Sequence, residues 1–170
     1  MSPEVKGAKS AAIQQFLKDR LKSENGSWAG FHSLSSEPNI QWQELAPHIH
    51  WTFPVVNGET MSFHNHSTEL AKSQLGVLEP VGTEAVDARD IVGVFVPGVA
   101  FSRSGHRLGR GRGYFDRTLN NYKGKKIGVC FSESLFDEIP KDDFDICCDE
   151  IITDTECLVI SSQKGEGKWN

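Results

Sequence analysis

The residues best suited to chemistry lie in one stretch, PGVAFSRSGHRLGRGRGYFDR, from Pro97 to Arg117. Five of the chain's seven arginines fall within fifteen residues there, and four glycines are threaded between them. Glycine lets backbone N–H groups approach a ligand closely, and each guanidinium supplies a fixed positive charge with several donors. The stretch follows an apolar run, residues 91–96, and leads into a predicted helix over residues 114–121. A strand, a Gly/Arg loop and a helix in this order predict a polyphosphate site.

The alternative interpretation of this stretch is a solvated loop whose charge only aids solubility. Its spacing matches neither G-x-x-x-x-G-K-[ST] nor G-x-G-x-x-G followed by a ribose-binding acid. The buried-looking PGVAF before the glycines and the helix-forming YFDRTL after them favour a binding site. Asp116 could cap the helix or bind a cation that bridges phosphates. The acidic run over residues 142–150 is by default a solvated face, although one member could reach the site.

Histidines and cysteines provide weaker signals. Two histidine pairs have i, i+2 spacing, His48 with His50 and His64 with His66. The two pairs could together bind a metal. Exposed histidines in strands or turns are the simpler interpretation. The four cysteines form no C-x-x-C pair and indicate reduced thiols in a cytoplasmic protein. The adjacent Cys147 and Cys148 would point to opposite faces of a strand, which argues against a shared metal.

The rest of the chain predicts the elements that position this loop. We expect helices over residues 9–22, 38–46 and 132–138, and strands over residues 27–34, 49–56, 60–64, 91–96, 126–131, 151–153 and 158–160. Residues 74–89 read as irregular. Short apolar strands that alternate with helices predict an α/β fold, a single-domain three-layer Rossmann-like arrangement with a mainly parallel central sheet. Ligands bind beyond the carboxyl ends of strands in such sheets, where the Gly/Arg stretch lies.

Length and composition narrow the class of protein. The 170 residues predict one domain over residues 1–160, with a polar, Gly-rich tail over residues 161–170 expected to be disordered. The net charge of −5 argues against a protein that coats nucleic acid. No apolar stretch approaches the ~20 residues of a membrane span, and the N-terminus lacks the apolar core of a secretory signal. We therefore expect a cytoplasmic protein without nucleic-acid or membrane partners, either a monomer or a weak homodimer.

The Gly/Arg stretch resembles the signature of 5-formyltetrahydrofolate cyclo-ligase, also called methenyltetrahydrofolate synthetase, which reads roughly P-G-x-x-F-D-x-x-G-x-R-L-G-x-G-x-G-Y-Y-D-R. The segments FHSLSSEPN, FPVV, GVLEP and DICCDEIITD extend the resemblance to roughly residues 28–154. It implies an ATP- and Mg²⁺-dependent closure of 5-formyltetrahydrofolate to 5,10-methenyltetrahydrofolate. The formyl oxygen attacks the γ-phosphate, N10 attacks the activated carbon, and phosphate leaves. Such chemistry needs charge neutralisation and alignment more than a protein nucleophile.

The resemblance also implies roles for individual residues. An ATP site would contain Lys9, Gly105, Arg107, Leu108, Gly109, Arg110, Gly111, Arg112 and Gly113. Arg110 and Arg112 would act in catalysis, and Asp116 and Asp149 would hold Mg²⁺. The reduced folate would contact Glu37, Val55, Met61, Phe63 and Phe115. The Glu37 carboxylate would pair with N–H donors of the pterin, and Phe115 would stack on the folate.

Several positions depart from the family pattern. Ser102 replaces an Asp, Phe115 replaces a Tyr, and Ser134 stands where a Gln is frequent. The family's N-terminal K-x-x-x-R helix is followed by a second helix, whereas Lys9 is followed by Ile13 and the first predicted strand comes soon after. One alternative is therefore a family member that binds nucleotide or folate with altered or lost catalysis. Another is an RNA-binding protein with an RGG-like segment, although such segments are usually disordered and repetitive.

Overall fold

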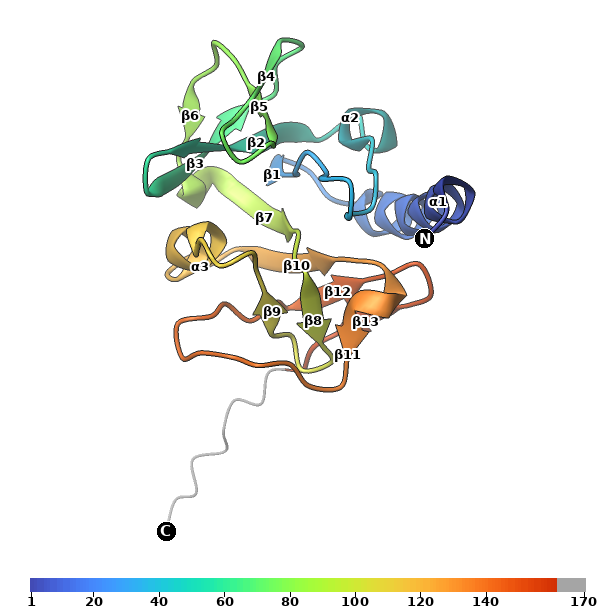
Figure 1. Ribbon diagram of the computed structural model, residues 1–170. Coiled ribbons are helices and arrows are strands. Elements are labelled where there is room, and N and C mark those ends of the chain that lie inside the picture. Colours follow the sequence, from blue (N-terminus) through green and yellow to red (C-terminus); the bar gives the residue numbers. More distant parts are fainter. Residues whose placement is uncertain (162–170) are drawn as a thin grey trace.

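A large sheet forms the centre of the computed structural model, which describes residues 1–161 (Figure 1). Its eight strands have the order β13-β12-β10-β7-β1-β2-β3-β6. They are β1 (Ser27–Ala29), β2 (His50–Asn57), β3 (Thr60–Asn65), β6 (Ala85–Val86), β7 (Ile91–Val96), β10 (Lys125–Val129), β12 (Glu150–Ile152) and β13 (Cys157–Val159). The strands from β12 to β2 run parallel, and β13, β3 and β6 add antiparallel edges. The predicted α/β fold with a mainly parallel sheet is confirmed.

Helices cover both faces of this sheet. The described residues form α1 (Pro3–Leu21), α2 (Trp42–Leu45), α3 (Tyr114–Leu119) and two 3₁₀ turns, η1 (Ala88–Asp90) and η2 (Ser132–Ser134). Leu17 of α1 is fully buried in a cluster with Trp28 and Phe95 on one face. Leu119 of α3 packs with Val94 and other residues on the opposite face. Because neighbouring strand residues point to opposite faces, the same strands supply both clusters and three layers result.

The helix α1 begins six residues earlier than predicted. Ser2 is its N-cap, and the Ser2 hydroxyl accepts a hydrogen bond from the Val5 N–H (3.3 Å). Pro3 occupies the first position of the helix, where its missing N–H costs nothing. The apolar periodicity starts only at Ile13, so the capping residues rather than the buried face mark the true start. Within residues 1–161, no helix combines the length and apolar character needed to span a bilayer.

Short strands account for most of the remaining differences from the prediction. A small sheet of β8 (Ala100–Ser102), β9 (Arg107–Leu108) and β11 (Leu135–Phe136) replaces the first half of the predicted Gly/Arg loop and part of the helix predicted over 132–138. A hairpin pairs β4 (Leu70–Lys72) with β5 (Leu78–Pro80). β5 and β6 thus form strands within residues 74–89, for which the sequence predicts irregular structure. Strands of two or three residues are too short to show an alternating pattern. Residues 162–170 of the predicted tail lie outside the described residues.

The first strand is also shorter than predicted, because the chain leaves the sheet after Ala29. Gly30 still donates its N–H to the carbonyl of Thr52 (3.0 Å), but the indole of Trp42 packs where a Gly30 Cβ would stand (2.9 Å). The following residues, up to Glu37, therefore lie beyond the carboxyl end of β1. This early exit brings Phe31 and Glu37 to the edge of the sheet at which ligands are expected.

Gly93 of β7 provides a test of the packing at the centre of the sheet. A Cβ at this position would lie 2.3 Å from the ring of Trp28, which is fully buried and cannot move away. We expect Gly93→Ala to lower the free energy of unfolding by about 1–3 kcal/mol. Gly7→Ala is the matched control, because no atom lies within 4 Å of its Cβ and alanine favours the helix by up to ~1 kcal/mol. Urea unfolding gives the free energy of unfolding of both variants and of the wild-type protein. A Gly93→Ala variant as stable as the wild-type protein would contradict this packing.

Candidate active site

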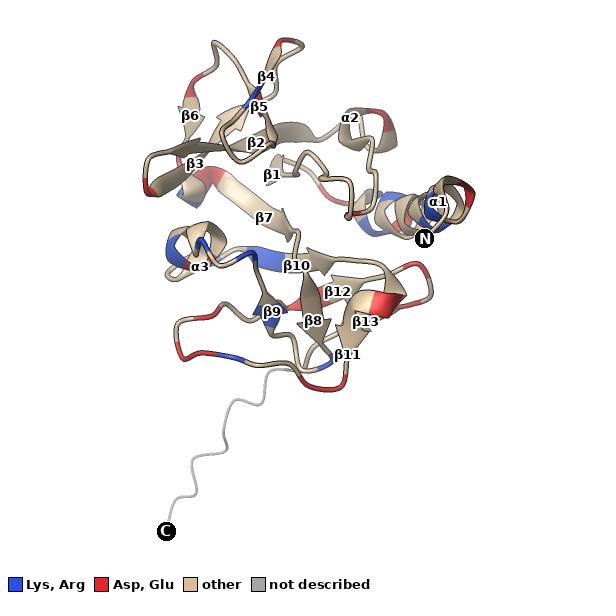
Figure 2. Cartoon of the chain, in the orientation of Figure 1, with Lys and Arg blue, Asp and Glu red and all other residues tan. Residues whose placement is uncertain are grey.

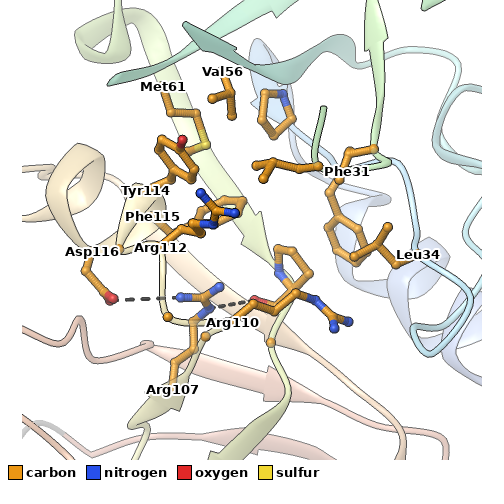
Figure 3. A pocket seen from close by; sticks show the side chains of 18 of the residues that line it. Phe31, Leu34, Val56, Met61, Arg107, Arg110, Arg112, Tyr114, Phe115 and Asp116 are labelled. Carbon is orange, nitrogen blue, oxygen red and sulfur yellow. Dashed lines mark hydrogen bonds and ion pairs between the residues drawn. The ribbon is translucent and has the colours of Figure 1, made fainter. Parts of the chain in front are cut away.

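A pocket of about 400 Å³ opens at the carboxyl side of the parallel strands (Figure 3). Five parts of the chain line it: the segment after β1, the β2–β3 hairpin, the β4–β5 hairpin, residues between 97 and 116 that include β9 and the start of α3, and Asp145. In Figure 3, Arg107 and Arg110 lie at one end, Val56 and Met61 at the other, and Arg112 between them. The pocket therefore joins a cationic end to an apolar end, at the position where parallel sheets bind ligands.

Arg107 organises the cationic end from beneath. Its side chain is only 7% exposed, and its Nε donates a hydrogen bond to the Pro97 carbonyl (2.5 Å). Its Nη1 lies 3.9 Å from Oδ1 of Asp116, and its guanidinium stacks on Phe115 at 4.9 Å from the ring centre. Burial lowers the pKa of Arg107, whereas the charge of Asp116 acts to raise it. A guanidinium retains its proton in proteins, so Arg107 is a fixed charge that holds the loop.

The glycines of the loop have steric as well as conformational roles. A Cβ at Gly109 would lie 2.8 Å from Nη1 of Arg107, so the Arg107 guanidinium requires glycine there. Gly111 (φ +89°) and Gly113 (φ +70°) have left-handed conformations that disfavour other residues. Gly113 directly precedes α3. The alternation of glycine and arginine thus lets the chain turn tightly around a buried arginine.

Arg110 and Arg112 are the more accessible arginines of the pocket. Nη2 of Arg110 lies 2.8 Å from the Ser36 hydroxyl and 3.4 Å from Oε1 of Glu37. Glu37 is buried, and its Oε2 accepts a hydrogen bond from the Leu34 N–H (2.8 Å). Arg112 is exposed, and its guanidinium forms no ion pair within residues 1–161. Both guanidinium groups can therefore reach an anion in the pocket.

A model of the 5-formyltetrahydrofolate cyclo-ligase family matches residues 38–154, more than half of the chain. The chain belongs to the 5-formyltetrahydrofolate cyclo-ligase family. The cyclo-ligase of Escherichia coli K12 is 31% identical over 135 residues, which cover 71% of each chain. That of Mycolicibacterium smegmatis is 33% identical over 96 residues, 53% of this chain and 48% of the relative. The match thus spans about half the length of some curated relatives.

Solved structures of 5,10-methenyltetrahydrofolate synthetases share the fold. The Aquifex aeolicus protein, solved by NMR, is 30% identical with a TM-score of 0.80, over 95% of this chain and 86% of that one. The Mycoplasma pneumoniae protein is 23% identical with a TM-score of 0.75, over 91% of this chain and 90% of that one. Both structural matches extend beyond the residues that the family model matches. At 23% identity, the match to the Mycoplasma pneumoniae protein supports the fold alone.

Most residues that the cyclo-ligase resemblance implies do line the pocket. They are Glu37, Met61, Arg107, Leu108, Gly109, Arg110, Gly111, Arg112, Gly113, Phe115 and Asp116. Five other predicted residues do not line it: Lys9, Gly105, Val55, Phe63 and Asp149. The pocket is thus built largely from the cyclo-ligase signature. The predicted residues that do not line it lie mostly outside that signature.

Of the three residues on the β2–β3 hairpin that the resemblance assigns to the folate, Met61 lines the pocket and Val55 and Phe63 do not. Pro54 and Val56 line the pocket, whereas Val55 between them does not. Side chains alternate along a strand, so a shift of one residue reverses the face. Phe63 of β3 is almost fully buried in the core cluster that contains Val94. Val55 therefore faces away from the pocket, whereas Phe63 shares the face of Pro54, Val56 and Met61 but is packed in the core rather than at the pocket.

The structure brings Asp116 together with Asp145 rather than with Asp149. Asp145 lines the pocket alongside Asp116. Oδ1 of Asp116 accepts a hydrogen bond from the Ile146 N–H (3.1 Å), which ties the two segments together. Asp149 instead accepts a hydrogen bond from the Lys126 N–H (2.8 Å) and so joins β12 to β10. Figure 2 shows how acidic residues spread along the loop between β11 and β12, of which only Asp145 reaches the pocket.

Lys9 and Gly105 have structural partners away from the pocket. Lys9 forms ion pairs with Glu133 and with Asp154, the latter at 3.3 Å, and thus joins α1 to the end of β12. Gly105 has a φ of +98° in the turn between β8 and β9, and a Cβ there would lie 2.7 Å from the Cys148 carbonyl. The resemblance implies that both residues belong to the ATP site, but neither lines the pocket. The N-terminal helix and the turn between β8 and β9 pack elsewhere.

Several residues of the pocket wall have no role in the predictions from the sequence. They are Phe31, His32, Leu34, Pro54, Val56, Ser73, Leu75, Val77, Glu79, Pro97, Gly98, Tyr114 and Asp145. The β4–β5 hairpin contributes four of them, and its GVLEP segment was recognised without a role. Alternation along residues 54–56 was the only signal that could have corrected the strand register.

The histidines do not assemble into a metal site. No group of three His, Cys, Asp or Glu residues able to hold a metal occurs within the part of the chain that the structure describes. His48 contacts the Leu21 carbonyl (3.0 Å), and His50 contacts the Asn65 side chain (2.7 Å). These contacts agree with the simpler interpretation. The four cysteines are free, and of the adjacent pair Cys147 is exposed and Cys148 is buried.

Proposed function

We propose that the chain converts 5-formyltetrahydrofolate and ATP to 5,10-methenyltetrahydrofolate, ADP and phosphate, with the formyl oxygen leaving as part of the phosphate. The observation that carries this proposal is the junction of a cationic end and an apolar end in one pocket. The arginines suit a triphosphate, and Val56, Met61 and Phe115 suit a ring system beside it. A formyl oxygen held at the junction would lie next to the phosphoryl group that activates it.

The residues of the cationic end have distinct proposed roles. Arg110 and Arg112 would neutralise the charge that develops on the transferred phosphoryl group. Arg107 is a positioning residue, because it contacts Pro97, Asp116 and Phe115 from below the loop. Glu37 orients Arg110, and the hydrogen bond from Leu34 fixes the Glu37 carboxylate. The geometry thus favours alignment and charge neutralisation over attack by a protein nucleophile.

Asp116 and Asp145 would hold Mg²⁺ in this site. Mg²⁺ commonly binds one or two carboxylates together with phosphate oxygens and water, so two carboxylates beside the arginines suit it. Only one oxygen of each carboxylate has a hydrogen-bond partner within residues 1–161, namely Oδ1 of Asp116 and Oδ2 of Asp145. When bound, the ion neutralises phosphate charge. Asp145 would then take the role that the resemblance implies for Asp149.

The assignment of the carboxylates predicts different behaviour for two neighbouring acids. Asp145→Asn is expected to raise the Mg²⁺ concentration for half-maximal turnover by about tenfold, which corresponds to about 1.4 kcal/mol, because the ion loses one of its carboxylate ligands. Asp149→Asn should leave that concentration unchanged and lower thermal stability, because Asp149 joins β10 to β12. Titrations of turnover against Mg²⁺ and thermal melts of both variants measure this. A raised Mg²⁺ requirement in Asp149→Asn, with an unchanged one in Asp145→Asn, would instead indicate that Asp149 binds the ion.

A turnover assay tests the proposed reaction. Purified protein, ATP, Mg²⁺ and 5-formyltetrahydrofolate should produce the near-ultraviolet absorbance of methenyltetrahydrofolate, and omission of ATP should abolish it. No product at high protein concentration would contradict the proposal. Calorimetry with ATP and with the folate would then show whether the chain only binds these ligands.

We further propose that the partners are reduced folate and ATP rather than nucleic acid or a membrane. The Arg/Gly segment is folded between β7 and α3, which disfavours an RGG-like role. The free cysteines agree with a reducing, cytoplasmic compartment. A monomer or weak homodimer is the expected state, and analytical ultracentrifugation measures it.

A further inference from the structure

Arg117 ends the Gly/Arg stretch, but it does not line the pocket. Its guanidinium forms no ion pair with a carboxylate within residues 1–161. It instead donates two hydrogen bonds to backbone carbonyls, from Nη1 to that of Arg112 (2.8 Å) and from Nη2 to that of Glu59 (2.8 Å). A guanidinium presents several donors in a fixed plane, so this one side chain joins two segments that are far apart in the sequence.

The two segments that Arg117 joins belong to different ends of the pocket. Arg112 lies on the Gly/Arg loop, which forms the cationic end. Glu59 lies at the tip of the β2–β3 hairpin, and Val56 and Met61 of that hairpin line the apolar end (Figure 3). The two hydrogen bonds of Arg117 therefore hold one end of the pocket in a fixed position relative to the other.

Neighbouring residues of α3 support this link. The Tyr114 hydroxyl donates a hydrogen bond to the Gly58 carbonyl (2.8 Å), and the guanidinium of Arg117 lies over the Tyr114 ring, 5.3 Å from its centre. Gly113 leaves room for the guanidinium, because a Cβ there would lie 2.7 Å from Nη1 of Arg117. Two consecutive carbonyls at the tip of the hairpin are thus held by side chains of α3.

We propose that Arg117 is a positioning residue that acts through Arg112 and sets where the Arg112 guanidinium meets the transferred phosphoryl group. This inference rests on the proposed function. The Arg112 guanidinium forms no ion pair within the described residues, so the fold constrains Arg112 through its backbone, at the carbonyl that Arg117 binds. A misplacement of about 1 Å at a catalytic group can lower the rate about 100-fold.

A double-mutant cycle in turnover tests this role. Arg117→Ala should lower kcat by about 10- to 100-fold and change the KM values for ATP and folate by less than about threefold, because alignment matters most in the transition state. In an Arg112→Ala background the same change should lower kcat by less than about twofold, because the group that Arg117 positions is already absent. Arg117→Lys should recover only part of kcat, since an ammonium lacks the planar fork that reaches both carbonyls. Arg89→Ala removes an exposed arginine outside the pocket and should leave kcat unchanged.

Hydrogen exchange provides a second measurement that needs no turnover. Arg117→Ala should speed amide exchange in residues 57–61 and in residues 113–118 together, by about five- to tenfold relative to the wild-type protein. Unchanged exchange in these segments would overturn the link between the two ends of the pocket. A loss of kcat that is equally large with and without Arg112 would show a general structural effect and would also overturn the role of Arg117. Absence of turnover in the wild-type protein would instead contradict the proposed function, and the positioning role with it.

Discussion

Replacement of Arg112 by alanine is expected to lower the turnover number by about 100- to 1,000-fold, with little change in stability. Removal of one preorganised donor from the site of developing charge has an effect of this size. Arg112 is exposed and forms no ion pair within residues 1–161, so the folded chain loses little when its guanidinium is removed. Steady-state kinetics with saturating ATP and folate measure the effect.

A matched control for Arg112→Ala is Arg103→Ala. Arg103 belongs to the same sequence stretch, but it pairs with Glu156 (2.8 Å) and does not line the pocket. We expect this variant to turn over like the wild-type protein. Equal losses in the two variants would indicate a general effect of positive charge, and full activity of Arg112→Ala would refute its catalytic role.

Arg107→Ala is expected to abolish turnover and also to destabilise the fold. The variant loses the hydrogen bond to the Pro97 carbonyl and the contacts with Asp116 and Phe115. Loss of a buried, charged hydrogen-bonding group typically lowers the free energy of unfolding by about 2–4 kcal/mol. Arg107→Lys should restore little, because an ammonium cannot reproduce the planar stacking and the Nε contact.

Urea unfolding and turnover distinguish Arg107 from the ligand-binding arginines. Arg89→Ala is the control, because Arg89 is fully solvated and pairs only with Asp87 (2.6 Å) within the described residues. We expect its unfolding midpoint and its activity to equal those of the wild-type protein. An Arg107→Ala variant that retains full stability would contradict the supporting role, even if its turnover were lost.

The parts of the fold that could be predicted have strong local patterns. Several neighbouring residues indicate the same structure in each of three places: the apolar run of β7, the Asn57-Gly58 turn and the apolar face of α1. β4, β5, β8 and β9 could not be predicted, because strands of two or three residues are determined by packing with distant segments. The same limit applies to the start of α1, where a cap and not a periodic pattern decides the boundary.

The residues of the candidate site also fall into those that a local pattern predicts and those that distant packing determines. The cyclo-ligase signature located the arginines, the glycines and Asp116, because consecutive residues form one end of the pocket. The exchanges of Val55 for Val56 and of Asp149 for Asp145 depend on strand register and on the path of a loop. His32 belongs to the FHSLSSEPN segment, but the resemblance implies no role for it, and only the structure places it in the pocket wall.

The contact between Gly109 and Arg107 has a consequence for how this loop can change over evolutionary time. Gly109 has no positive φ, so its backbone would accept alanine, and the three atoms nearest to a Cβ there all belong to the guanidinium of Arg107. A substitution at position 109 is therefore harmful or neutral according to the residue at position 107. In a background where Arg107 is already shortened, Gly109→Ala should cost almost nothing further, so the two effects are not additive. The order in which the two positions mutate determines which sequences can be reached.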